Sequence, residues 1–227
     1  MKQVSRDWET VWRKHPIDYG RPIDFSARDR KFLSIIQKYV GKGKLVLEAG
    51  CGDGIPLICF CRMGATCVGI DIILTPLTVL NGYLKSTDFT AFVINGDVTK
   101  LPFRSSVFNV ITSFGVVEHF RDLSEAVEFL VNCKESLNRD GFLILTKPNL
   151  AETFIHKFAL FVSKGRFGMY HRPMTMSMLL GLFNTIRGFR VVKKGFISFG
   201  FRELALDLYK KPSIRKSVYF SYHSVWG

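Results

Sequence analysis

The feature that most constrains this chain is an alternation of short apolar runs with helix-like segments between residues 44 and 149. The apolar runs occupy residues 44–50, 66–71, 90–96, 108–115 and 141–149. Strands that are apolar on both faces occur in parallel sheets covered by helices on both sides. The pattern therefore predicts an α/β fold with a doubly wound, mostly parallel sheet and helices on both faces.

The C-terminal part adds two more strand-like runs, at residues 190–199 and 217–226. We expect them to complete a seven-stranded sheet with an antiparallel C-terminal strand. Between the second and third runs, a helix is expected to begin with Thr75 as N-cap and Pro76 at its first helical position.

The length of 227 residues suits a single domain with a full α/β core. We expect one domain over residues 1–227, divided into four parts. These are N-terminal helices (1–40), a ligand-binding core (44–149), a substrate-side lid region (150–187) and closing strands (188–227).

Positive charge is concentrated in the second half of the chain. Beyond residue 138, Lys and Arg outnumber Asp and Glu by 15 to 4, whereas before it the numbers are 17 and 15. A cationic surface of this kind suits nucleic acid, an anionic lipid headgroup or a phosphorylated small molecule, or it only aids solubility.

Cysteine usage and hydropathy bear on location. The five cysteines are odd in number, and Cys59 and Cys61 lack the CxxC spacing of a structural zinc site. We interpret all five as reduced core thiols and expect no metal site. The N-terminus has no signal-peptide pattern and no apolar run approaches the length of a membrane span. We expect a cytoplasmic protein, with peripheral membrane contact as an option.

A glycine-rich turn follows the first apolar run, as Gly50-Cys51-Gly52-Asp53-Gly54. Glycines permit positive φ and close backbone approach to a ligand, and such a turn leads into a helix N-terminus that binds anions. The spacing GxGxG differs from the dinucleotide fingerprint GxGxxG, because Ile55 stands where the third glycine is required. No P-loop sequence occurs.

Two carboxylates end the next two apolar runs. Asp71 lies 21 residues after Gly50, where a ribose diol meets a carboxylate in nucleotide-binding sheets. Asp97 follows the third run. Either residue alone is an ordinary turn aspartate; together, beside a glycine turn, they indicate a nucleoside-like ligand.

These segments carry a family resemblance. The sequences VLEAGCGDG, VGIDI, NGDVTKLPF, FNVITSFGVVEHFRD and GFLILTKPN, in this order, resemble the motifs of class I S-adenosylmethionine-dependent methyltransferases. The chain is most similar to the small-molecule, ubiquinone-biosynthesis-like branch (methyltransferase type 11). One departure is Asn109, where the family often has Asp.

The resemblance implies a cofactor, S-adenosyl-L-methionine (SAM), with S-adenosyl-L-homocysteine (SAH) as product. It implies that Glu48 and the turn of Gly50, Gly52 and Gly54 hold the methionine moiety. Ribose would be bound by Asp71 and the adenine by Ile72, Asp97 and Val98, with Ser113 and Phe114 near the sulfonium. Tyr19 is a further candidate, as a cap over the cofactor.

Methyl transfer from a sulfonium requires alignment of the nucleophile and exclusion of water, and a hydroxyl nucleophile gains from a general base. His119 and His171 are the candidate bases, each with a purely structural role as the alternative.

The predicted acceptor is a small molecule or a lipid-like molecule, anionic or partly hydrophobic. Three phenylalanines at helical spacing beside lysines in residues 152–165 suggest a lid or an interfacial helix on anionic lipid. Nucleic acid is the main rival acceptor, although the chain lacks a basic run and the Asn/Asp-Pro-Pro-aromatic motif of amino-group methylation. A protein acceptor and a non-catalytic binding subunit are the remaining alternatives.

Overall fold

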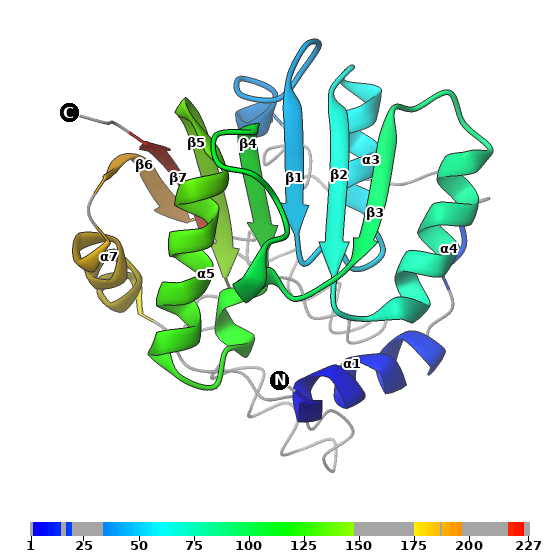
Figure 1. The fold of residues 1–227 in the computed structure, drawn as a ribbon, viewed down its shortest axis with the longest axis horizontal. Coiled ribbons are helices and arrows are strands. Elements are labelled where there is room, and N and C mark those ends of the chain that lie inside the picture. The colour runs from blue at the N-terminus through cyan, green and yellow to red at the C-terminus, as the bar shows by residue number, and fades with distance from the viewer. Residues whose placement is uncertain are drawn as a thin grey trace, which may run out of the picture.

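The fold was analysed in a computed structural model, which describes residues 2–14, 17–19, 34–147, 175–186, 188–196 and 218–224. Five parallel strands lie side by side in the sheet, in the order β3-β2-β1-β4-β5 (Figure 1). Their bounds are Leu45–Ala49 (β1), Thr66–Asp71 (β2), Ala91–Asn95 (β3), Phe108–Phe114 (β4) and Leu137–Lys147 (β5). The predicted doubly wound, mostly parallel sheet is confirmed for these strands.

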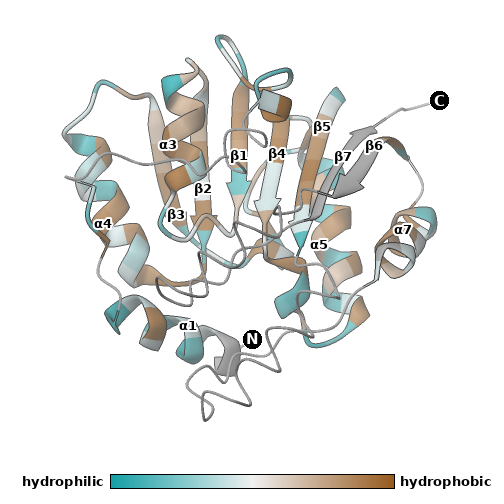
Figure 2. Ribbon diagram, turned by 180° about the vertical axis from the view of Figure 1, so that it is seen from behind, coloured by the Kyte–Doolittle hydropathy of each residue, from teal (hydrophilic) through white to brown (hydrophobic). Residues whose placement is uncertain are grey.

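Helices cover both faces of this sheet (Figures 1 and 2). They are α3 (Ile55–Arg62) and α4 (Leu74–Lys85) on one side, and α5 (Leu123–Ser136) and α7 (Met176–Thr185) on the other. Strand alternation separates the two cores: Val46 packs with the residues of α3 and α4, whereas Leu47 packs with those of α5. The apolar strands between them are brown in Figure 2.

Helix α4 corrects the expected start at Thr75. The helix begins at Leu74, with Ile73 as N-cap, because the Asp71 carboxylate accepts a hydrogen bond from the Ile73 N–H and turns the chain earlier. The Thr75 hydroxyl instead donates to Glu9 of the N-terminal helix α1 (Lys2–Lys14). In α7 the N-cap is Thr175, whose hydroxyl accepts from the Met178 N–H.

Beyond β5 the chain adds β6 (Phe189–Phe196) and β7 (Val218–Ser224), and β7 pairs antiparallel with β5 and with β6. All five cysteines are buried and none forms a disulfide, as expected for core thiols. Among the described residues, no helix has the length and apolar character needed to cross a membrane.

The order of the parallel strands reverses between β1 and β4. Ligands of open α/β sheets bind beyond the carboxyl ends of the strands at such a point. In Figure 1, helix α1 lies across these carboxyl ends.

Candidate functional site

A pocket of about 450 Å³ lies at the carboxyl ends of the strands, beneath α1. Its walls come from the segments that follow β1, β2, β3 and β4, and from α1 itself. The lining residues are Trp8, Trp12, Glu48, Gly50, Cys51, Gly52, Asp53, Pro56, Asp71, Ile72, Ile73, Asp97, Val98, Phe114, Gly115, Val116, His119 and Phe120.

The glycine turn at one end of this pocket depends on its three glycines. Gly50, Gly52 and Gly54 have φ of 78°, 50° and 65°, a region that other residues rarely adopt. A Cβ on Gly50 would lie 2.3 Å from Val116 Cγ2, and one on Gly54 would lie 2.3 Å from Leu80 Cδ2. The GxGxG spacing is therefore required by backbone conformation and by close packing.

Asp71 holds this turn against the end of β2. Its Oδ2 accepts from the Gly52 N–H at 2.8 Å and its Oδ1 accepts from the Ile73 N–H at 2.9 Å. Burial raises the pKa of the Asp71 carboxyl, whereas these backbone hydrogen bonds oppose that rise. The carboxylate is thus fixed at the pocket wall, with each oxygen able to accept a further hydrogen bond.

Asp97 lies at the neighbouring strand end. Its Oδ1 accepts from both the backbone N–H and the hydroxyl of Thr99, each at 2.8 Å, and so caps the short 3₁₀ helix η1 (Val98–Lys100). Val98 is buried beside it, and both residues line the pocket. Ile72 lines the same wall and keeps 39% of its surface exposed, which suits contact with a flat ligand.

Glu48 places a buried carboxyl group at the pocket wall. It lies in β1, one residue before the strand ends, with 2% of its surface exposed, and its Oε2 has no hydrogen-bond partner in the part of the chain that the structure describes. Burial, and then the negative charge of Asp53, raise the pKa of the Glu48 carboxyl well above its usual value. A buried acceptor of this kind at a pocket wall is suited to a ligand that donates hydrogen bonds and carries positive charge.

Ser113 and Gly54 do not line the pocket, unlike the other predicted cofactor residues. Ser113 lies one residue before Phe114 on β4, and its buried Oγ also lacks a hydrogen-bond partner within the described ranges. Gly54 contributes through the shape of the turn, because Leu80 occupies the space next to it.

The pocket also has an aromatic part, which reaches the glycine turn, since a Cβ on Gly52 would lie 3.1 Å from the Trp12 ring. His119 ends the 3₁₀ helix η2 (Val117–His119), and its ring meets Trp8 edge-on at a centroid distance of 5.3 Å. Trp8 stacks on Trp12 at 6.0 Å, and Glu9, between them, joins α1 to α4 through Thr75. His171, the other candidate base, lies outside the described residues.

Sequence reasoning missed the two tryptophans as site residues. Both lie within residues 1–40, for which only N-terminal helices were expected, with no link to the pocket. The available signal was the pair of indoles four residues apart in a helix whose other residues are mostly polar or charged. Tyr19 behaves differently from its predicted capping role: its hydroxyl donates to the Asp53 carbonyl and its ring stacks on Tyr83, so it supports the glycine turn and does not line the pocket.

Two buried charged residues were also missed. Lys147, at the end of β5, and Glu118, in η2, are 3% and 2% exposed. Burial lowers the pKa of the Lys147 ammonium, and the negative charge of Glu118 opposes that shift. In the described part of the chain, no group of three or more His, Cys, Asp or Glu side chains is arranged to hold a metal ion.

Comparison with known proteins decides the family. A family model described as a methyltransferase domain matches residues 47–145. The ubiquinone biosynthesis O-methyltransferase of Actinobacillus pleuropneumoniae serotype 5b is 33% identical over 153 residues, which cover 65% of this chain and 62% of that protein. Residues 47–145 belong to a class I SAM-dependent methyltransferase domain. The predicted family, and with it the cofactor that the family uses, is confirmed.

Solved structures agree with the methyltransferase fold. The PH0226 protein of Pyrococcus horikoshii superposes with a TM-score of 0.73 at 18% identity, over 95% of this chain and 98% of that one.

A second curated relative of the methyltransferase domain is the tRNA U34 carboxymethyltransferase of Pseudomonas paraeruginosa, 30% identical over 59% of this chain and 42% of that protein. The chain thus spans less than two thirds of the length of these curated relatives.

Proposed function

We propose that this chain transfers a methyl group from SAM to a small-molecule or lipid-like acceptor that is anionic or partly hydrophobic. The observation that carries the proposal is one continuous pocket with an acidic, glycine-rich end and an aromatic end that includes His119. The first end suits a nucleoside with an amino acid tail, and the second suits an apolar acceptor.

The residues at the acidic end fit SAM. The unpaired Oε2 of Glu48 would accept from the ammonium of the methionine moiety, and the glycine turn allows the ligand to approach the backbone. Asp71 would accept from the ribose hydroxyls. Ile72 and Val98 would contact the adenine ring, and Asp97 its amino group. When bound, SAM supplies a methyl group already activated by the sulfonium.

The aromatic end would align the acceptor and exclude water. Trp8, Phe114, Val116 and Phe120 line it with apolar surface, and α1 closes it from the side of solvent. His119 would take the proton of an acceptor hydroxyl at its imidazole nitrogen. His171, outside the described residues, stays a second candidate.

The ubiquinone biosynthesis relative supports a small-molecule acceptor, and the tRNA-modifying relative keeps nucleic acid as the alternative. Lipid-like acceptors are favoured by the phenylalanine-rich segment of the lid region 150–187, much of which is outside the described residues. We further propose peripheral contact with anionic lipid through this region.

We also propose that residues 1–227 form one domain and that β6 and β7 complete a seven-stranded sheet. Support comes from the antiparallel pairing of Phe142 with His223 and of Val191 with Tyr222. Hydrogen exchange tests this proposal: amides of 218–224 should be protected to a degree similar to those of β5, and rapid exchange there would contradict it.

Isothermal titration calorimetry with SAH tests the site. We expect the parent chain and Asp88→Ala, a carboxylate removed from an exposed loop, to bind equally, and Asp71→Ala to bind at least tenfold more weakly. Equal affinity for Asp71→Ala would refute the site assignment, and lack of binding at millimolar SAH would refute the enzyme.

The acceptor class is tested with methyl-labelled SAM. Label should enter phenolic or lipid-like small molecules and not bulk transfer RNA. Incorporation into RNA alone would favour the alternative.

A further inference from the structure

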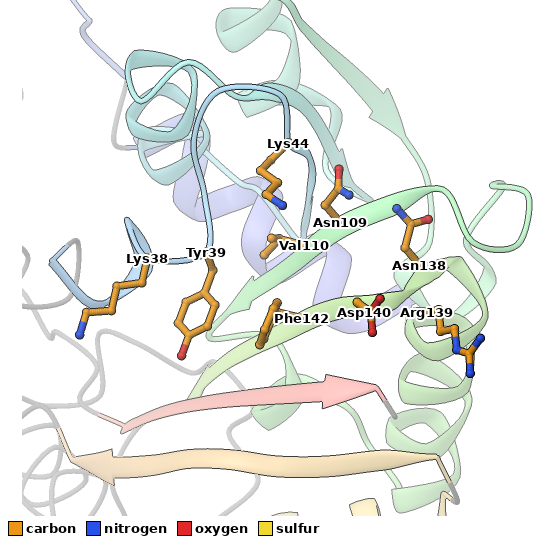
Figure 3. Close-up of a pocket in the computed structure, with 9 residues that line it drawn as sticks. All are labelled: Lys38, Tyr39, Lys44, Asn109, Val110, Asn138, Arg139, Asp140 and Phe142. Carbon is orange, nitrogen blue, oxygen red and sulfur yellow. The ribbon is translucent and has the colours of Figure 1, made fainter. Parts of the chain in front are cut away.

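A second cavity, of about 320 Å³, lies at the opposite ends of the strands, beside the amino ends of β1, β4 and β5 (Figure 3). Lys38, Tyr39 and Lys44, from the segment that leads into β1, form one wall, and residues near the start of β4 and β5 form the other. None of its lining residues lines the pocket at the carboxyl ends. The methyltransferase reaction proposed above leaves this cavity without a role.

A large bulge at the start of β5 forms one wall of this cavity. Phe108 pairs with Leu137, and Val110 pairs with Phe142, so two steps along β4 correspond to five along β5. The extra residues project Asn138, Arg139 and Asp140 to the rim. Gly141 packs closely here, since a Cβ would lie 3.2 Å from the Asn109 carbonyl oxygen. Bulges often re-aim side chains beside functional sites.

Asn109 supplies hydrogen-bond donors to this cavity. Its Oδ1 accepts from the Leu45 N–H at 2.8 Å, which fixes the orientation of the amide and leaves its NH₂ group for the cavity. The related methyltransferases often carry Asp at this position. An aspartate could accept the same Leu45 hydrogen bond but would add a negative charge, whereas asparagine adds donors.

The charge of the lining is positive. Lys38, Lys44 and Arg139 face a single acidic residue, Asp140. Within the described part of the chain, neither Lys38 nor Lys44 forms an ion pair. In Figure 3, Lys44 lies on the same side of the cavity as Asn109. An ammonium and an amide NH₂ that share one side favour an anionic group between them.

The other side of the cavity is aromatic. The rings of Tyr39 and Phe142 lie side by side, with centroids 4.6 Å apart at an interplanar angle of 48°. Both line the cavity and neither is fully buried. The volume lies at the lower end of the range for small-molecule sites. The lining thus combines a cationic, donor-rich side with a flat apolar side.

We propose that this cavity, the amino-edge anion site, binds a small organic anion that carries a phosphate or carboxylate group on a flat apolar body. Lys44 and the Asn109 amide bind the anionic group. Tyr39 and Phe142 contact the flat body, and Lys38 and Arg139 add positive charge at the rim. The site is independent of SAM.

Calorimetry on the full chain, with and without saturating SAH, tests the proposal with phenyl phosphate and benzoate as probes. Whether phenyl phosphate or benzoate binds identifies the preferred anionic group. Phenol measures the affinity of the ring alone, and inorganic phosphate measures the affinity of the anionic group alone. We expect a probe with both parts to bind at least tenfold more tightly than either part, and SAH to leave its affinity unchanged.

Variants distinguish this site from general attraction to a basic protein. Asn109→Asp keeps an acceptor for the Leu45 N–H, so it should keep the parent melting temperature and SAH affinity while it weakens probe binding at least tenfold. Lys44→Glu should weaken it further. Asn81→Asp, the same change at an exposed position of α4, should have no effect. The proposal is overturned if neither probe binds at millimolar concentration, if SAH displaces the probe, or if Asn109→Asp and Asn81→Asp bind it alike.

Discussion

Replacement of Glu48 by Gln separates the ligand-binding role of this residue from its effect on stability. The substitution keeps the size of the side chain at a site that is 2% exposed, and it removes the charge. A hydrogen bond to a charged partner contributes about 1.5–3 kcal/mol. If Oε2 accepts from the ammonium of SAM, the Kd of SAM in Glu48→Gln should rise about 10- to 150-fold.

The pH dependence of SAM binding gives a second readout of the same residue. Burial holds the pKa of the Glu48 carboxyl well above its usual value in the ligand-free pocket, and a bound ammonium would lower it. Between the lower pKa of the bound state and the higher pKa of the free state, binding releases a proton. Affinity should therefore rise with pH across this window and level off above the free-state pKa, whereas this rise should be absent in Glu48→Gln.

Stability should change in the opposite direction. The folded-state pKa of Glu48 lies above its unfolded value of about 4.3, so the folded chain holds a proton that the unfolded chain has lost. The contribution of Glu48 to stability therefore falls as pH rises from the unfolded pKa to the folded pKa. Ligand-free Glu48→Gln should melt at a higher temperature than the parent at pH 8, and this difference should shrink toward pH 4.

Calorimetry in buffers of different ionisation enthalpy measures both the Kd and the proton release, and thermal scans measure stability. Glu128→Gln, the same change at an exposed position of α5, is the matched control and should alter neither. Unchanged SAM affinity in Glu48→Gln, with no proton release in the parent, would refute the role assigned to Glu48.

Three further predictions test the glycine turn, the candidate base and the buried thiols. Gly54→Ala should destabilise the fold by about 1–3 kcal/mol, because the residue has positive φ and the new Cβ would meet Leu80. The control Gly82→Ala, in open space on α4, should stabilise the fold by about 0.5–1 kcal/mol. Denaturant midpoints in the reverse order would contradict this. His119→Gln should lower kcat at least about 100-fold while the Kd of SAH stays constant, and an unchanged kcat would rule out His119 as the base. Iodoacetamide should modify Cys51 slowly, because burial raises the pKa of its thiol. Bound SAH should slow the modification of Cys51 further but not that of Cys133, which does not line the pocket. Rapid modification of Cys51 would contradict its burial.

Most of the acidic end of the pocket could be predicted from the sequence because each of its residues lies at a strand end or in a turn. In a parallel sheet the carboxyl ends of the strands lie together, so residues that follow these ends are expected at one site. Gly50, Asp71 and Asp97 could therefore be assigned to one site before any side-chain contact was known, and all three line the pocket. The contact of Gly54 with Leu80 could not be predicted in this way, since it depends on how α4 packs.

The sequence by itself determined the order of strands and helices, the glycine turn and the two carboxylates that follow β2 and β3, because these depend on local spacing and hydrophobic periodicity. The tertiary structure decided what faces them. It placed Trp12 against the glycine turn, left a buried oxygen of Glu48 without a partner among the described residues, and brought Asn109 and Lys44 to one cavity at the amino ends of the strands. Each of these contacts joins residues far apart in the chain, and their positions depend on packing and strand register, which no local pattern encodes.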